Sequence, residues 1–356
     1  MKIHNYSPGP CILPAEVFQK ASEAILDFDQ LGLSILEISH RSKNFIAVME
    51  RAMALVKELM GLPEGYSVLF LGGGASLQFC MLPYNLMKAE NGKAGYLVTG
   101  TWAKNAWKEA KLFGNSMALA SSEDQNFSYI PKGFELPEGL DYFHTTSNNT
   151  IFGTQIKSFP KYNGLNVCDM SSDIFSRQLD FSQFDLIYAG AQKNMGPAGV
   201  TAVIVRDRIL GKSGRPIPSM LDYAVHIDKE SMYNTPPVYA VYVTMLTLEW
   251  LQRNGGVAWI EGINRQKADL LYTEIDRNPL FVGTAAVEDR SDMNACFLLK
   301  DPSMEPRFDA AWKAAGISGL PGHRSVGGYR ASLYNALSLE SVQVLVDVMK
   351  EFERTV

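Results

Sequence analysis

The chain has 356 residues, of which 46% are hydrophobic and 20% are charged, and its formal net charge is −5. This composition is typical of a globular protein with a sizeable core, and the length is enough for two domains. An acidic chain without a basic run gives no electrostatic reason to expect nucleic acid or a membrane surface as a partner.

In the first two thirds of the chain, helical patterns alternate with short apolar runs. Apolar side chains between residues 45 and 60 recur at helical spacing, and Gly61 is a typical end for such a helix. Another helix is predicted from Ala103 to Phe113. The apolar runs predict seven strands, at Tyr66–Leu71, Gly95–Thr99, Met117–Ala120, Asp141–Thr145, Leu165–Cys168, Phe184–Tyr188 and Val200–Val205.

This alternation predicts an α/β fold with a mostly parallel seven-stranded sheet between helices. Val200–Val205 follows the preceding strand too closely for a helical crossover, so we expect it to run antiparallel to its neighbour. The carboxyl ends of the parallel strands are where open α/β sheets bind ligands.

The last third of the chain has a different order of helices and strands. Two long helices are predicted, from Pro236 to about Arg253 and from Val257 to about Asp276. After them come two strands and two helices, in the order Ala295–Leu299, Phe308–Ala315, Arg330–Tyr334 and Leu339–Arg354. We therefore expect a large α/β domain over residues 16–260 and a smaller α+β domain made of residues 1–15 and 261–356.

A lysine and an aspartate lie at two of the predicted strand ends. Lys193 follows the strand ending at Tyr188, within the sequence Ala189-Gly190-Ala191-Gln192-Lys193-Asn194, and Asp169 directly follows Cys168. If the two strands are parallel neighbours, both side chains emerge at the carboxyl edge of the sheet. A pyridoxal phosphate (PLP) enzyme needs this pair, because the lysine forms a Schiff base and the aspartate keeps the pyridine nitrogen protonated. The alternative is that Lys193 is an ordinary loop lysine.

Three further strand ends and one helix start carry groups that suit a ligand. Gly72-Gly73-Gly74-Ala75-Ser76 opens a helix, where backbone N–H groups favour a phosphate. Thr101-Trp102 offers an indole that can stack on a flat ring, and Ser147-Asn148-Asn149-Thr150 offers hydroxyl and amide groups. Asn234-Thr235-Pro236-Pro237 begins a long helix, where Thr235 is a helix cap, a phosphate contact or both. The simpler interpretations of the first three are a glycine-rich turn, a core tryptophan and a polar turn.

Two clusters of basic residues stand out in this acidic chain. One is Ser39-His40-Arg41-Ser42, and the other contains Gly322-His323-Arg324 and continues through glycines to Arg330. Arginine binds carboxylates and phosphates through paired N–H groups. For Arg41 alone, solvated surface charge is the simpler interpretation, whereas the glycines around the second cluster favour a binding role.

The cysteines and the N-terminal residues indicate the cellular compartment of the protein. Four cysteines, Cys11, Cys80, Cys168 and Cys296, have neither C-x-x-C nor metal-ligand spacing, so we expect buried free thiols in a reducing compartment and no metal site. The first residues resemble neither a signal peptide nor a transit peptide, and no stretch of about 18 apolar residues occurs. We therefore expect a cytoplasmic protein.

Taken together, these segments are similar to the phosphoserine aminotransferases, which belong to the class V aminotransferase group and have the PLP-dependent fold type I. The resemblance covers essentially the whole chain, and it implies that residues 16–260 form the PLP-binding domain. The motifs that carry it are Ser39-His40-Arg41, Gly190-Ala191-Gln192-Lys193-Asn194, Asn234-Thr235-Pro236-Pro237 and Gly322-His323-Arg324.

The resemblance implies a role for each site residue. Lys193 would form the Schiff base and move the substrate proton, Asp169 would pair with the pyridine nitrogen, and Trp102 would stack on the ring. Thr150 would contact the ring oxygen. The implied contacts of the cofactor phosphate are Ala75, Ser76, Gln192, Asn234 and Thr235. The implied contacts of the substrate anions are His40, Arg41, His323, Arg324 and Arg330. In this family, Asn234 and Thr235 would come from the other subunit of a homodimer.

The resemblance also implies a reaction in serine biosynthesis, in which L-glutamate and 3-phosphohydroxypyruvate give 2-oxoglutarate and O-phospho-L-serine. Both substrates carry an α-carboxylate and a distal anion, which suits several basic side chains around one lysine. Use of the related phosphorylated substrate of pyridoxine biosynthesis stays open. The alternatives are serine–glyoxylate transamination, cysteine desulfuration and a PLP-binding protein without activity. The scattered cysteines disfavour desulfuration, and the intact lysine and aspartate disfavour a loss of activity.

Overall fold

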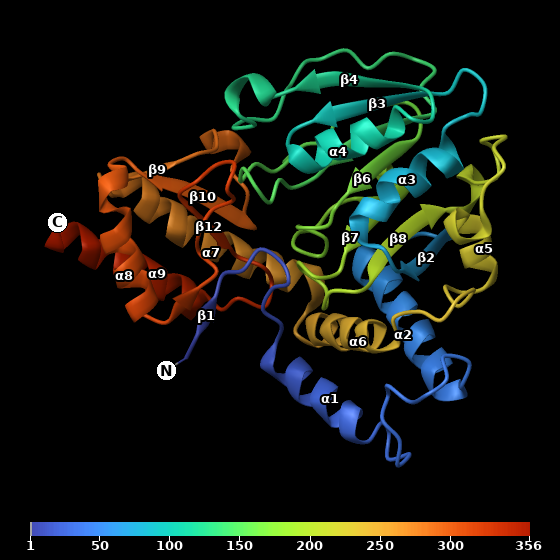
Figure 1. Cartoon of the computed structure of the whole chain (residues 1–356), viewed down its shortest axis with the longest axis horizontal. Coiled ribbons are helices and arrows are strands. Elements are labelled where there is room, and N and C mark those ends of the chain that lie inside the picture. The colour runs from blue at the N-terminus through green and yellow to red at the C-terminus, as the bar shows by residue number, and fades with distance from the viewer. Residues whose placement is uncertain (1) are drawn as a thin grey trace.

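Seven strands form the main sheet, and helices cover both of its faces (Figure 1). The structure, a computed structural model, describes residues 2–356. In spatial order the strands are β2 (Tyr66–Leu71), β8 (Thr201–Arg206), β7 (Leu186–Gly190), β6 (Asn166–Asp169), β5 (Tyr142–Thr146), β3 (Lys93–Val98) and β4 (Asn115–Ser121). β8 is antiparallel to both of its neighbours, and the other pairs are parallel. The predictions of a mostly parallel sheet and of one antiparallel strand after the lysine loop are confirmed.

Side chains of the main sheet alternate between two cores. In β2, Val68 and Phe70 face the first core, while Leu69 and Leu71 face the second, as the period of a strand requires. The first core is closed by α1 (Ala15–Leu26), α2 (Lys43–Met60) and α6 (Val238–Arg253). The second is closed by α3 (Gly74–Leu86), α4 (Thr101–Ala110) and α5 (Tyr223–Asp228). Burial on both faces explains why the strands are continuous apolar runs in the sequence.

A smaller antiparallel sheet lies at the other end of the molecule (Figure 1). Its strands are, in order, β12 (Tyr329–Ser332), β10 (Asn294–Leu299) and β9 (Phe281–Gly283). A third core forms between this sheet and α7 (Gly256–Arg277), α8 (Glu305–Ala314) and α9 (Leu339–Thr355). β1 (His4–Asn5) pairs with β11 (Ile317–Ser318) beside this core. α7 contributes side chains to both the first and the third core, and the predicted domain boundary at residue 260 stays a prediction.

Most predicted elements differ from the observed ones by a few residues at their ends, for local reasons. α2 follows Ser42, whose side chain accepts a hydrogen bond from Phe45 N, and it ends at Gly61, which has a left-handed φ of 59°. The predicted strand start at Phe184 is wrong, because Phe184 N donates to Phe181 O and closes a short turn before β7. α1, α5 and the short strands β1, β9 and β11 were not predicted.

Neither disulfides nor membrane-spanning helices occur within residues 2–356. All four cysteines are free thiols, with Cys168 and Cys296 buried and Cys11 and Cys80 partly exposed. Each helix is too short or too polar to cross a lipid bilayer. In the same residues, no three His, Cys, Asp or Glu side chains gather as metal ligands.

Lys267 of α7 is fully buried, although lysine is rarely buried without a carboxylate partner. Its Nζ donates to three backbone carbonyl oxygens, those of Leu333, Tyr334 and Leu337, at 2.8, 2.9 and 3.1 Å. Burial lowers the pKa of Lys267 to about 7. The side chain therefore ties α7 to the segment that follows β12, while its charge loses its hydration.

We expect Lys267→Met to lower the free energy of unfolding by about 3 kcal/mol at pH 7, because three buried carbonyl groups lose their donor. The pKa of Lys267 falls from its ordinary 10.5 to about 7 on folding. The unfolded state therefore binds more protons between these values, and the wild-type protein gains stability as the pH rises through that window. Urea denaturation from pH 6 to 10 measures both effects.

Arg265→Met, at an exposed position of the same helix, is the control and should change stability by less than about 0.5 kcal/mol. A Lys267→Met protein as stable as the wild type would contradict this expectation.

Candidate active site

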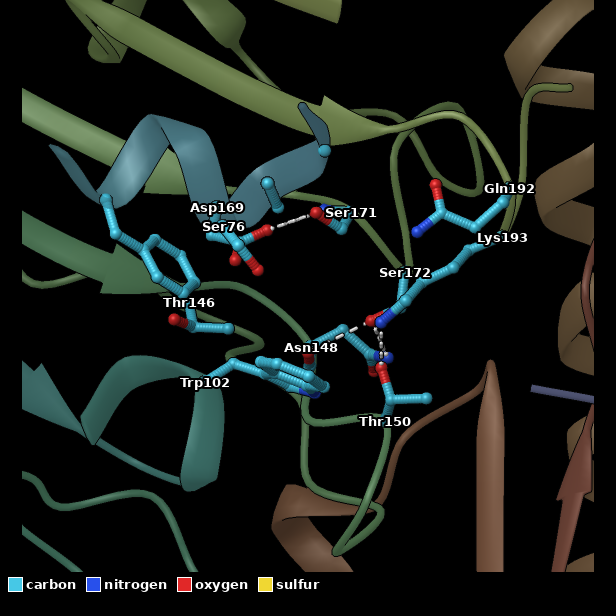
Figure 2. Close-up of a pocket in the computed structure, with 13 residues that line it drawn as sticks. Ser76, Trp102, Thr146, Asn148, Thr150, Asp169, Ser171, Ser172, Gln192 and Lys193 are labelled. Atoms are coloured by element: carbon cyan, nitrogen blue, oxygen red, sulfur yellow. Dashed lines mark hydrogen bonds between the residues drawn. The ribbon is translucent and has the colours of Figure 1, made fainter. Parts of the chain in front are cut away.

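A cavity lies at the carboxyl edge of the main sheet, where β5, β6 and β7 end (Figure 2). β6 and β7 are parallel neighbours, as predicted, so the loops after them open into the same space. The lining residues are Gly74, Ala75, Ser76, Phe79, Trp102, Thr146, Asn148, Thr150, Asp169, Ser171, Ser172, Gln192 and Lys193.

Backbone contacts on both sides fix the loop that carries Lys193. Ala191 N donates to Val200 O at 3.0 Å, and Cys11 N donates to Gln192 O at 3.1 Å. The Cys11 thiol donates to Lys193 O at 2.6 Å. With its backbone held in this way, Lys193 directs its side chain across the cavity toward Thr150 (Figure 2).

The amine of Lys193 has a lowered pKa. Burial, with a smaller contribution from the charge of Arg330, lowers this pKa to about 8 against the attraction of Asp169. Nζ donates to Thr150 Oγ1 at 2.8 Å and lies 5.8 Å from the centre of the Trp102 ring. A lysine with a pKa near neutral holds an appreciable fraction of its amine in the nucleophilic form.

In the ligand-free protein, we expect acetic anhydride to acetylate Lys193 with a pH midpoint near 8 rather than near 10.5. Peptide mass spectrometry after brief exposure across the pH range measures the modified fraction. Asp169→Asn removes the carboxylate that raises the pKa of Lys193, so its midpoint should move to lower pH. Midpoints near 10.5 in both proteins would contradict the lowered pKa.

Asp169 ends β6 and keeps one carboxylate oxygen available. Its Oδ1 accepts hydrogen bonds from Ser171 N at 2.9 Å and from Ser171 Oγ at 2.6 Å. Within residues 2–356, no hydrogen bond to Oδ2 is formed, and the carboxylate faces the cavity (Figure 2). Burial raises the pKa of Asp169, while the Ser171 bonds and the Lys193 charge oppose this effect. A cationic N–H group in the cavity would satisfy the free oxygen.

The glycine turn before α3 presents the start of that helix to the cavity. Gly73 and Gly74 have left-handed φ angles of 88° and 68°, and a Cβ on Gly73 would lie 2.4 Å from Leu77 Cδ2. The turn therefore needs glycine. It places the unpaired N–H groups at Ala75 and Ser76 along the cavity wall, where they favour an anion.

Seven of the predicted cofactor residues line this cavity together, from five separate segments of the chain. They are Ala75, Ser76, Trp102, Thr150, Asp169, Gln192 and Lys193. Four other lining residues were not expected at the site: Phe79, Thr146, Ser171 and Ser172. Ser171-Ser172 lies one residue beyond the strand end at Asp169, and this nearness is the signal that could have identified the pair.

Arg330 of β12 lies beside the cavity without a counter-ion. Its side chain is only 6% exposed, and its Nη1 donates to Thr150 O at 3.3 Å. Within residues 2–356, no carboxylate forms an ion pair with it, and its Nε has no hydrogen-bond partner. Arg330 and Lys193 both donate hydrogen bonds to Thr150, and the charge of Arg330 contributes to the lowered pKa of Lys193. A buried arginine without a counter-ion favours the binding of an anion.

The remaining predicted residues do not meet Lys193 within one chain. His40 and Arg41 contact each other on the surface, and neither lines the cavity. His323 and Arg324 lie in a partly exposed loop. Burial lowers the pKa of His323, and the charges of Arg330 and Arg324 lower it further. Two further predicted residues, Asn234 and Thr235, are exposed and line a separate cavity with Gly72 and Gly73.

The sequence matches known proteins over its full length. The family model for class V aminotransferases matches residues 3–345. The phosphoserine aminotransferase of Flavobacterium johnsoniae is 69% identical over 100% of both chains, and that of Parabacteroides distasonis is 56% identical over 99% of both.

Solved structures of the same kind share the fold. The phosphoserine aminotransferase of Bacillus circulans subsp. alkalophilus superimposes with a TM-score of 0.96 at 44% identity, covering 99% of both chains. A PLP-bound phosphoserine aminotransferase from Trichomonas vaginalis gives 0.92 at 35% identity, covering 98% of this chain and 100% of the other. The architecture is that of the fold type I PLP-dependent transferases, and the chain belongs to the class V aminotransferase family.

Proposed function

We propose that this protein is a PLP-dependent aminotransferase that transfers an amino group between L-glutamate and 3-phosphohydroxypyruvate, giving 2-oxoglutarate and O-phospho-L-serine. The observation that carries the proposal is the meeting of Lys193, Asp169 and the unpaired Arg330 around one cavity. The full-length similarity to phosphoserine aminotransferases supports this choice of substrates.

The cavity residues fit PLP. When bound, PLP supplies an aldehyde that reacts with amines and a ring that withdraws electrons. The first N–H groups of α3, at Ala75 and Ser76, suit its phosphate. Trp102 suits its ring, and the free oxygen of Asp169 suits its protonated nitrogen.

Three side chains would do the chemical work. Lys193 takes up and returns the substrate proton, which its pKa of about 8 allows near neutral pH. Asp169, held by Ser171, keeps a proton on the ring nitrogen. Arg330 binds the α-carboxylate of the substrate and so orients the carbon that loses its proton.

The other basic residues suit the distal anion of the substrate, which is a carboxylate in glutamate and a phosphate in the oxo acid. We assign this role to His40, Arg41, His323 and Arg324, and we assign Asn234 and Thr235 to the cofactor phosphate of the partner subunit in a homodimer. Their exposure and their position outside the Lys193 cavity favour a site that needs two chains. The four free thiols favour the cytoplasm as its location.

The test uses the purified protein loaded with PLP. Glutamate should change the visible absorbance of the bound cofactor, and 3-phosphohydroxypyruvate should restore it with formation of O-phospho-L-serine, identified by mass spectrometry. 3-Hydroxy-2-oxo-4-phosphooxybutanoate, of pyridoxine biosynthesis, carries the same two anions and is the second acceptor to test. Turnover of serine with glyoxylate, without turnover of either phosphorylated acceptor, would overturn the substrate assignment. A protein that binds PLP and leaves glutamate unchanged would overturn the activity.

Cysteine desulfuration is disfavoured by the positions of the thiols. Within residues 2–356, no cysteine lines the cavity. Burial raises the pKa of Cys168, Cys296 and Cys11 above the ordinary value of a thiol. Such thiols carry little of the reactive thiolate.

A further inference from the structure

Asn294 connects the small sheet to a loop that lines the cavity. It begins β10, is fully buried and pairs in register with Ser332 of β12. Its Oδ1 accepts from Asn148 Nδ2 at 2.8 Å, and its Nδ2 donates to Ser332 Oγ at 3.1 Å. Because Asn148 lines the cavity, one side chain joins the two parts of the structure.

Hydrogen bonds from other segments fix the Asn148 end of this connection. Asn148 Nδ2 also donates to Ser172 Oγ at 2.8 Å, a bond drawn in Figure 2. Its Oδ1 accepts from Ser291 Oγ at 2.5 Å, and Ser172 Oγ donates back to Asn148 O at 3.0 Å. A buried network satisfied in this way holds one arrangement, because breaking a bond leaves a polar group without a partner.

Two residues of the proposed reaction centre lie on either side of this connection. Arg330 is two residues before Ser332, and Thr150 is two residues after Asn148. Arg330 Nη1 donates to Thr150 O at 3.3 Å, and Thr150 Oγ1 accepts from Lys193 Nζ at 2.8 Å. The contact of Arg330 is long for a charged N–H donor. The shorter bonds from Ser332 through Asn294 to Asn148 therefore constrain the separation of β12 and the Thr150 loop more strongly.

We propose that Asn294 is a positioning residue for the substrate: it holds Arg330 at the distance from Lys193 at which one amino acid reaches both. This inference rests on the proposed function, in which Arg330 binds the α-carboxylate. Asn294 itself contacts Asn148, Ser332 and Tyr334, and acts through Arg330. Misplacement by about 1 Å in a site of this kind costs up to about 10²-fold.

The test compares Asn294→Ala and Ser332→Ala with a control, Asn278→Ala, in the PLP-loaded protein. Asn278 is also a buried amide of the last third of the chain, and its Nδ2 donates to Glu274 Oε1 and Met349 O, away from the cavity. Calorimetry with glutarate, which has two carboxylates and no amino group, measures binding without reaction. Single turnovers with L-glutamate separate the dissociation constant from the rate, and the visible absorbance reports the bound cofactor.

We expect the Kd of glutarate and of glutamate to rise about tenfold in Asn294→Ala and about threefold in Ser332→Ala, with the absorbance of the bound cofactor unchanged. The double variant should bind no more weakly than Asn294→Ala, because both changes act through one connection. Asn278→Ala should lower the Tm and leave both Kd values unchanged.

An Asn294→Ala protein that matches Asn278→Ala in both Kd values would overturn the inference. If Asn294→Ala does not fold, Ser332→Ala, which loses a single hydroxyl group, decides the question by the same measurements. If the wild-type protein binds glutarate and leaves glutamate unchanged, the proposed function fails, while the glutarate comparison still tests the role of Asn294.

Discussion

Lys193→Ala is expected to lower turnover by at least about 10⁴-fold in the PLP-loaded protein. The change removes the amine that lies beside Thr150 and Trp102 in the cavity, and with it the group that moves the substrate proton. The loop should keep its conformation, because its contacts with Cys11 and Val200 are made by its backbone atoms. None of these contacts needs the side chain of Lys193. The loss should therefore appear in the rate rather than in the Tm.

Single-turnover rates with L-glutamate measure this loss. Two comparisons test whether the missing amine is its cause. Thr150→Ala keeps the lysine, removes the hydroxyl group that accepts a hydrogen bond from Nζ, and should cost about tenfold. Methylamine, added to Lys193→Ala, fits the space left by the side chain and should restore part of the rate as a free base. Full turnover by Lys193→Ala would contradict the proposed chemistry.

The main sheet and the Lys193–Asp169 pair could be predicted from the sequence because their signals are local. Strands buried on both faces are continuous apolar runs, and the residues after parallel neighbours meet at one edge. The short interval between β7 and β8 leaves no room for a helical crossover, so the antiparallel direction of β8 also followed. Each inference needed the relation between adjacent segments alone.

The position of Arg330 could not be predicted in this way. Its contact with Thr150 joins residues 180 positions apart, and it depends on how the small sheet packs beside the main one. The same holds for Asn294, which the sequence shows only as a polar residue at a strand start. For His40, Arg41, His323 and Arg324, the predicted substrate contacts stay a prediction, because they are not gathered in the Lys193 cavity of one chain.

Asp169→Asn is expected to lower turnover by about 10³-fold while PLP still binds. Asparagine keeps nearly the same shape and can still accept the Ser171 bonds, so the cavity should be preserved. It carries no negative charge, however, and its amide cannot hold a proton on the ring nitrogen as an ion pair does. The effect should therefore fall on the proton-transfer rate measured in single turnovers, and Asp169→Glu should recover part of it.

The control for Asp169→Asn is Asp185→Asn, which removes a buried carboxylate just before β7, at the opposite edge of the same strands. Asp185 accepts from Asn166 N at 2.9 Å and pairs with Arg206 at 3.1 Å. Its loss should lower the Tm and leave turnover within about twofold, because it lies a strand length from the cavity. If both variants lost turnover equally, the effect would come from destabilised strands. A fully active Asp169→Asn protein would instead show that the charge at this strand end has no part in catalysis.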